Sequence, residues 1–129
     1  MKPPKFPGRT EELESVIVAR ILKNLRKIPR SWWVKQHGSA MSTRGVPDIL
    51  GCVDGRFFAF EVKRPGKEAT PAQLKKLGEI RSALGHAYVV TSLAEVEVVM
   101  MTTSGVRIPS KGKNPEHSVP GVEVRKEGL

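Results

Sequence analysis

Apolar residues recur at helical spacing along the first quarter of the chain. This apolar stripe consists of Val18, Ile21, Leu22, Leu25 and Ile28. Thr10 stands before the stripe, and acidic side chains follow within about one turn at Glu11, Glu12 and Glu14. A threonine hydroxyl can cap free N–H groups, and carboxylates favour the positive end of a helix dipole. We therefore expect a helix that begins at Thr10 and ends before Pro29.

Three short runs rich in aromatic and β-branched residues come next and predict strands. They cover residues 32–34, 49–53 and 56–63. Asp54 and Gly55 join the last two runs, and this pair is a strong signal for a two-residue hairpin turn. Adjacent residues on a strand face opposite sides, so we expect at least one of Trp32 and Trp33 in the core.

A second helix is predicted directly after Thr70. Pro71 suits the first helical position, because the N–H that it lacks would have no partner there. The apolar stripe of this helix consists of Leu74, Leu77, Ile80 and Leu84. Gly85 is expected to end the helix, and an apolar strand over residues 87–91 follows.

The segment after Ser92 is compatible with two structures. Ser92 can cap a helix that reaches about Met101, whereas apolar residues also alternate as in a strand at Val96, Val98 and Met100. We favour the helix. Residues 104–129 are rich in Gly, Pro, Ser and Lys, and residues 1–9 contain three prolines. We therefore expect one domain over residues 10–103 between two extensions.

The composition supports a single basic domain. A chain of 129 residues buries about two thirds of its unfolded surface, which is enough for one core. With 22 Lys plus Arg against 13 Asp plus Glu, the formal net charge is +9. Such an excess indicates a polyanionic partner, because basic residues near phosphates release counterions. Nucleic acid is the first candidate, and an anionic membrane surface is the second.

Several classes of protein are disfavoured by the absence of their signals. No apolar run approaches the roughly 20 residues of a membrane-spanning helix, and the start of the chain has no signal-peptide pattern. We therefore expect a cytoplasmic protein. Cys52 is the single cysteine, so it can form neither an intramolecular disulfide nor a cysteine zinc site. We interpret it as a small buried residue on a strand.

The informative charges are the scarce acids that lie among apolar residues. Asp48 begins one predicted strand, and Glu61 and Lys63 project from the same face of the next. If the hairpin pairs these strands, the two carboxylates converge. Carboxylates supply hard oxygen ligands that suit magnesium or manganese and not zinc. A simpler reading takes Asp48 as a turn residue and Glu61 with Lys63 as an exposed ion pair.

Three short motifs resemble those of the VRR-NUC (virus-type replication-repair nuclease) domain, a branch of the PD-(D/E)XK nucleases. They are Gly45-Val46-Pro47-Asp48, Glu61-Val62-Lys63-Arg64-Pro65-Gly66 and Thr70-Pro71-Ala72-Gln73. The resemblance covers about residues 11–101. It implies an α/β restriction-endonuclease-like fold, with a central mixed sheet of about four strands flanked by helices. It also implies that Asp48, Glu61 and the Val62 carbonyl bind Mg²⁺, for which Mn²⁺ can substitute, and that Lys63 is the catalytic lysine.

The resemblance assigns two further polar residues. Gln73 matches the glutamine of the family, although without the family we would interpret it as a solvent-facing helix residue. The family also places a glutamate on the first helix, near the metal. Glu14 fits best because it leads the apolar stripe, and Glu11 is the alternative one turn earlier. All three glutamates of this turn also fit the simpler role of complementing the helix dipole.

A phosphate-binding surface is expected around the predicted strand that contains Glu61 and Lys63 and around the helix after it. Its candidate residues are Arg44, Arg64, Lys67, Lys75 and Lys76. Together with the resemblance, this surface favours a magnesium-dependent endodeoxyribonuclease. By the same resemblance, such a small stand-alone domain would act as a homodimer on four-way (Holliday) junctions, one active site for each cut. The alternatives are a non-catalytic nucleic-acid-binding module, and a flap or restriction-type nuclease on the same fold.

Overall fold

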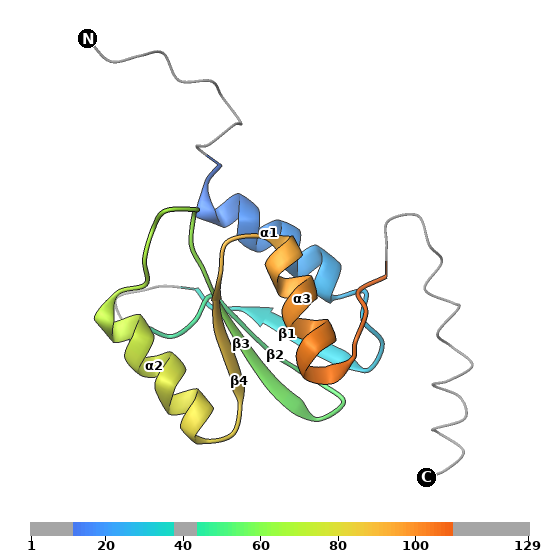
Figure 1. Cartoon of the computed structure of the whole chain (residues 1–129). Coiled ribbons are helices and arrows are strands. Elements are labelled where there is room, and N and C mark those ends of the chain that lie inside the picture. The colour runs from blue at the N-terminus through green and yellow to red at the C-terminus, as the bar shows by residue number, and fades with distance from the viewer. Residues whose placement is uncertain (1–11, 38–43, 110–129) are drawn as a thin grey trace, which may run out of the picture.

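A four-stranded mixed sheet forms the middle of the computed structural model, which describes residues 12–37 and 44–109 (Figure 1). In chain order the elements are α1 (Glu14–Leu25), β1 (Ser31–Lys35), β2 (Ile49–Val53), β3 (Arg56–Val62), α2 (Pro71–Ser82), β4 (His86–Val90) and α3 (Leu93–Ser104). The strands lie in the order β1-β2-β3-β4, and only β3 and β4 are parallel. Figure 1 shows α1 and α3 on one side of the sheet and α2 on the other. The predicted α/β architecture, a mixed sheet of about four strands flanked by helices, is confirmed.

Helix α1 buries the predicted apolar stripe but begins later than expected. Its N-cap is Leu13, whose side chain makes no capping hydrogen bond. Thr10 lies outside the described residues, yet Glu12 is not helical, so a helix that runs continuously from Thr10 is wrong. Glu12 instead forms an ion pair with Arg20. In a continuous helix, residues eight apart in the sequence lie about 12 Å apart along the axis, which is too far for a direct ion pair. Glu12 reaches Arg20 because it lies outside the helix.

The predicted hairpin is confirmed at the turn between β2 and β3. Asp54 and Gly55 have φ values of 51° and 82°, the positive range that a tight two-residue hairpin turn needs. The following strand ends at Val62, one residue earlier than expected. Lys63 nevertheless continues the pairing, because its N–H donates to the Val90 carbonyl at 2.9 Å.

The main core lies between the sheet and the helix pair α1 and α3. It includes Ile17, Val18, Ile21, Leu25, Ile49, Phe58, Phe60, Val62, Val96 and Met100. Trp33 joins this core and Trp32 is 64% exposed, as the alternation along β1 predicted. A Cβ on Gly51 would lie 2.3 Å from the Trp33 ring, so the glycine makes room for the indole. Ile108, beyond the expected domain boundary at 103, is also buried in this core. Cys52 lies on β2 as expected but is only half-buried.

A smaller apolar contact joins α2 to the opposite face of the sheet. Leu77 packs there against Ala59 and Ala87. The predicted four-residue stripe is therefore wrong in part, because Leu74 and Leu84 are 51% and 90% exposed. Ile80, another predicted position, is partly buried against the same contact, and Leu84 lies past the last helical residue, Ser82.

Helix α3 settles the ambiguous segment after Ser92 in favour of the helix. The Ser92 side chain accepts a hydrogen bond from the Glu95 N–H at 3.2 Å, as an N-cap does. Val96 and Met100 are buried while Val98 between them is 61% exposed, which fits a helix and not the alternation of a strand. The helix ends at Ser104, slightly beyond the expected Met101. No helix in the described part of the chain is long and apolar enough to span a bilayer.

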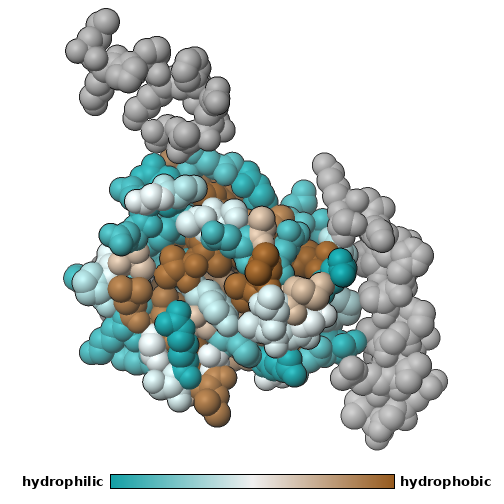
Figure 2. All heavy atoms as spheres, viewed as in Figure 1, coloured by the Kyte–Doolittle hydropathy of each residue, from teal (hydrophilic) through white to brown (hydrophobic). Residues whose placement is uncertain are grey.

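Apolar side chains reach the surface where β4 and α3 face the viewer in Figure 2. The exposed apolar residues of these two elements are Val89, Val98 and Met101. Helix α3 contains Glu95 and Glu97 but neither lysine nor arginine. Helix α3 therefore offers no basic side chain to the phosphates of a nucleic acid.

Candidate active site

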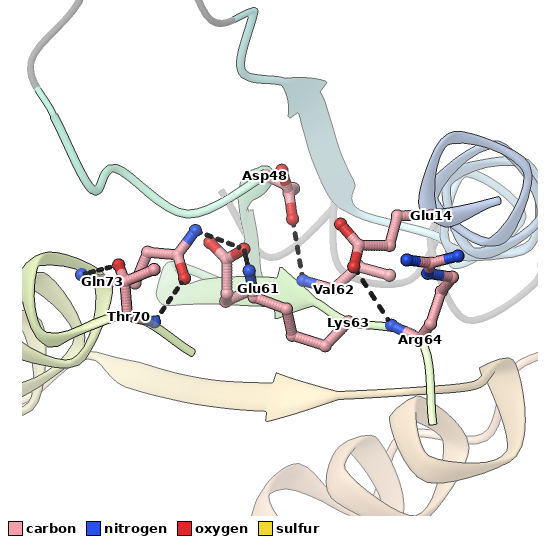
Figure 3. A network of polar contacts seen from close by, with 8 residues as sticks. All are labelled: Glu14, Asp48, Glu61, Val62, Lys63, Arg64, Thr70 and Gln73. Carbon is pink, nitrogen blue, oxygen red and sulfur yellow. Dashed lines mark hydrogen bonds and ion pairs between the residues drawn. The ribbon is translucent and has the colours of Figure 1, made fainter. Parts of the chain in front are cut away.

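Two carboxylates from neighbouring strands converge at one end of the sheet (Figure 3). In the antiparallel pair of β2 and β3, Ile49 is opposite Phe60, which places Asp48 opposite Glu61. The Val62 N–H donates to Asp48 Oδ2 at 2.8 Å and ties the residue before β2 to the backbone of β3. The hairpin therefore brings together the two acids that the sequence singled out, and Val62 itself points into the core.

Glu61 is the one buried charged residue among those the structure describes, with 2% of its surface exposed. Its Oε2 accepts a hydrogen bond from Gln73 Nε2 at 3.1 Å, and Lys63 Nζ lies 3.9 Å from the same oxygen. Its Oε1 is buried and has no hydrogen-bond partner. A buried carboxylate oxygen without a partner is costly, because it has lost its contacts with water and gained none in return.

The surroundings of Glu61 disfavour its negative charge. Burial, reinforced by the nearby negative charge of Asp48, raises the pKa of Glu61 from an ordinary 4.5 to about 8. The Lys63 ammonium acts in the opposite direction, and the more distant carboxylate of Glu14 adds a small further increase. In the absence of a bound cation, Glu61 is therefore mostly protonated at pH 7.

Glu14 reaches the same region from the first turn of α1. Its Oε2 accepts a hydrogen bond from the Arg64 N–H at 3.3 Å, which connects α1 to the segment after β3. Glu12 instead pairs with Arg20, and Glu11 lies outside the described residues. Of the glutamates that the structure describes near the start of α1, Glu14 is thus the one placed toward the carboxylate pair.

The predicted basic residues divide into two groups. Arg64 and Lys67 line a surface cavity of about 520 Å³, whose other lining residues are Leu13, Glu14, Lys63, Glu68 and Thr70. Arg44 and Lys75 are exposed, and Lys76 forms an ion pair with Glu79 in its own helix at 3.4 Å. The structure thus places Arg64 and Lys67 beside Glu14 and Lys63, while Lys75 and Lys76 lie further along α2.

The loop that carries Asp48 is seated against the first turn of α2. Gly45 has a φ of +86°, and a Cβ on it would lie 2.6 Å from the Ala72 carbonyl oxygen. Neither this backbone conformation nor this separation accommodates a side chain. The glycine of the Gly45-Val46-Pro47-Asp48 motif therefore allows β2, β3 and α2 to bring their polar residues to one place.

We expect Gly45→Ala to destabilise the fold more than Gly66→Ala. Gly66 has nearly the same φ, +87°, but a Cβ there would have no neighbour within 4 Å. Both substitutions carry the cost of a left-handed alanine, about 1 kcal/mol, and Gly45→Ala adds the clash with α2, about 1–3 kcal/mol. Denaturant unfolding of both variants measures the difference. Equal losses would show that the close contact with α2 is not required.

The residues at this site fit a divalent cation with oxygen ligands. Among residues 12–37 and 44–109, no three His, Cys, Asp or Glu side chains lie together as a complete metal site. Magnesium, however, is commonly held by only one or two carboxylates, with water and substrate phosphates as its other ligands. Asp48 and Glu61 form such a pair. The buried Glu61 Oε1, which lacks any hydrogen-bond partner, is a hard donor of the required kind.

Sequence reasoning did not include Thr70 and Gly45 among the functional residues. The sequence indicates Thr70 as the start of a helix and as part of the Thr70-Pro71-Ala72-Gln73 motif, and a threonine three residues before a glutamine is also the signature of a capping box. Gly45 was recognised only as part of a motif. Its need to be glycine follows from the contact with Ala72, which joins residues that are far apart in the sequence.

Comparisons with known proteins agree with this architecture. No protein-family model matches the sequence, and no curated protein sequence matches it. Among solved structures, a "VRR_NUC domain" superposes with a TM-score of 0.57 at 20% identity, covering 70% of this chain and 96% of that one. The Holliday junction resolvase Hjc from Archaeoglobus fulgidus matches with a TM-score of 0.43 at 18% identity, covering 57% of this chain and 63% of that one. The chain therefore has the fold of the VRR_NUC domain, as the sequence motifs indicated.

Proposed function

We propose that this chain, which has the fold of a VRR_NUC domain, is a metal-dependent endonuclease that hydrolyses DNA phosphodiester bonds. The observation that carries the proposal is the buried Glu61 Oε1 without a hydrogen-bond partner, on a carboxylate that also approaches Asp48 and Lys63. Such a cluster costs stability, and a cation together with an anionic substrate would compensate that cost. The net charge of +9 supports DNA as the substrate.

Each polar residue of the cluster has a defined role in this mechanism. Asp48, Glu61 Oε1 and the Val62 carbonyl would hold Mg²⁺ or Mn²⁺, and Glu14 would contribute from α1. Such an ion polarises the scissile phosphate and lowers the pKa of a bound water. Lys63, with 13% of its side chain exposed, places its ammonium beside Glu61, where it orients the attacking water or neutralises charge that develops on phosphorus. Arg64 and Lys67, in the adjacent cavity, would contact neighbouring phosphates.

The substrate that we propose is branched DNA, with the four-way junction first. The motifs of the sequence resemble those of the VRR-NUC domain, and this resemblance implies a four-way junction as the substrate. A homodimer would supply two active sites for paired cuts on the two strands. The enzyme would act in the cytoplasm of a bacterium or a phage-infected host, where such DNA occurs.

The alternative of a different class is a basic module that binds nucleic acid without cutting it. For a binding module, the wild type and Lys63→Ala would bind DNA with the same affinity, and neither would cut it. A flap nuclease or a restriction-type nuclease would share the active site and differ in the DNA that it cuts. The buried, unpaired oxygen of Glu61 favours a catalytic site over the binding module, since a protein that only binds phosphate needs no buried carboxylate.

The proposed activity is tested with four-way junction, flap, nicked and linear duplex DNA, each with and without Mg²⁺. We expect the wild type to cut the junction only with metal, and Lys63→Ala to bind DNA with little change but to cut at least about 10³-fold more slowly. Loss of several kcal/mol of transition-state stabilisation corresponds to such a factor. Lys23→Ala is the control, because Lys23 is exposed in the last turn of α1 and is not among the expected phosphate-binding residues.

Three outcomes would change the proposal. Absence of cleavage by the wild type on every DNA would favour the binding module. Cleavage that continues in the presence of a chelator would exclude the metal mechanism. Paired, symmetric cuts made by a protein that sediments as a monomer both alone and on DNA would contradict the homodimer.

A further inference from the structure

The amide of Gln73 is held in one orientation by the first turn of α2. The Thr70 N–H donates to Gln73 Oε1 at 2.8 Å, and the Gln73 N–H donates to Thr70 Oγ1 at 3.2 Å (Figure 3). These two bonds form the capping box of the helix. A main-chain N–H can only donate, so it fixes which end of the amide is the oxygen. The NH₂ group must then point away from Thr70.

That NH₂ group reaches Glu61. Gln73 Nε2 donates to Glu61 Oε2 at 3.1 Å, and Lys63 Nζ lies 3.9 Å from the same oxygen. Both polar neighbours therefore engage Oε2, whereas Oε1 is buried without a hydrogen-bond partner. The side chain of Glu61 is thus oriented by groups that come from α2 and from the end of β3.

We infer that Thr70 is a positioning residue, which acts through Gln73 to hold Glu61 Oε2 so that Oε1 is the atom presented to the metal. The inference rests on the proposed function, because it requires a cation at Glu61. It gives the capping box of α2 a second role besides stabilising the helix. Neighbours that orient a metal ligand commonly change metal affinity 10- to 100-fold when they are removed.

Substitutions at Thr70 separate the two contacts of the capping box. Thr70→Val removes the hydroxyl and keeps the N–H, whereas Thr70→Pro removes both. Proline is compatible with this position, because Thr70 has a φ of −73°. Thr70→Ser keeps both contacts. Ser92→Ala is the matched control, since Ser92 accepts the equivalent capping bond from Glu95 at the start of α3, away from the site.

The experiment is a titration of each DNA-free protein with Mn²⁺, followed by calorimetry or electron paramagnetic resonance, together with a thermal melt. We expect Thr70→Pro to weaken Mn²⁺ binding about 10-fold and Thr70→Val to weaken it less, with Thr70→Ser like the wild type. Ser92→Ala should lower the melting temperature about as much as Thr70→Val without changing Mn²⁺ affinity. Gln73→Met should weaken binding as Thr70→Pro does, and the double variant should show no further loss.

The results that would overturn the inference are distinct from those that concern the function. If Thr70→Pro bound Mn²⁺ as tightly as the wild type does, the positioning role of Thr70 would be overturned. The same would follow if Thr70→Pro weakened binding as strongly in the Gln73→Met background as in the wild type. Either result would leave the metal site itself intact. An equal loss of affinity in Ser92→Ala would also overturn the positioning role, since the effect would then come from stability alone. Failure of the wild type to bind Mn²⁺ would overturn both the metal site and the positioning role of Thr70.

Discussion

Glu61→Gln is expected to abolish cleavage and, at the same time, to raise the thermal stability of the metal-free protein. The glutamine keeps the size of the side chain and can still accept the hydrogen bond from Gln73, but it carries no charge and is a poor ligand for Mg²⁺. Loss of a metal ligand should reduce the rate of cleavage by about 10³-fold or more. A substitution that removes activity and adds stability indicates a residue retained for chemistry.

The stabilising effect of Glu61→Gln should depend on pH in a defined direction. The pKa of Glu61 is raised to about 8 in the fold and is near 4.5 when the side chain is exposed in the unfolded chain. Below about pH 4.5 the carboxyl is neutral in both states, so the variant and the wild type should differ little. Between pH 4.5 and 8 the unfolded chain releases the proton first, and the wild type loses stability as pH rises. Above pH 8 the difference should reach a plateau on the order of 5 kcal/mol.

Thermal melts of the metal-free proteins from pH 4.5 to 9 measure this difference. Glu97→Gln on the exposed side of α3 is the matched control, and it should change neither the melting curve nor cleavage. A rise in melting temperature on the order of 10 °C is expected for Glu61→Gln at pH 9. If Glu61→Gln instead melted below the wild type throughout this range, the charged form of Glu61 would be stabilising, contrary to the burial that raises its pKa.

Asp48 should behave differently, because its carboxylate has both a structural and a chemical task. Asp48 Oδ2 accepts the hydrogen bond from the Val62 N–H at 2.8 Å. Asp48→Ala leaves that donor unpaired and should cost about 1–3 kcal/mol of stability, whereas Asp48→Asn can keep the bond through its amide oxygen. Both variants lose a charged ligand, so both should reduce cleavage by about 10³-fold or more.

Denaturant unfolding and single-turnover cleavage of the two Asp48 variants separate the two tasks. We expect Asp48→Asn to unfold close to the wild type and Asp48→Ala to unfold earlier, with cleavage lost in both. Added Mg²⁺ should stabilise the wild type and neither variant, because ligand binding to the folded state shifts the unfolding equilibrium. Substantial cleavage by Asp48→Asn would mean that Asp48 acts through its hydrogen bond alone.

The convergence of the central polar residues could be predicted because they lie on one hairpin. Asp48, Glu61 and Lys63 are brought together by the alternation of side chains along strands and by a turn whose residues set the register. Both signals are local, so the sequence contains them in full. The structure places all three residues as that pattern predicts.

The positions of Glu14 and Gln73 could not be derived in this way. Each lies on a helix that packs against the sheet, and the rotation of a helix against a sheet depends on which side chains fill the space between them. For α2 that space is filled by Leu77 and Ile80 over Ala59 and Ala87, and two of the expected apolar positions remain exposed. For α1 the helix begins at Glu14, and Glu12 forms an ion pair with Arg20 outside the helix.

The sequence by itself determined the order of the elements, the hairpin and the identity of the two converging acids, because these follow from local periodicity and turn chemistry. Tertiary structure alone decided which oxygen of Glu61 is left without a partner. That choice depends on Gln73 and Thr70, twelve and nine residues away along the chain, and on the seating of Gly45 against Ala72. Such contacts between separate elements have no local signal, because they arise only when the helices and the sheet have packed.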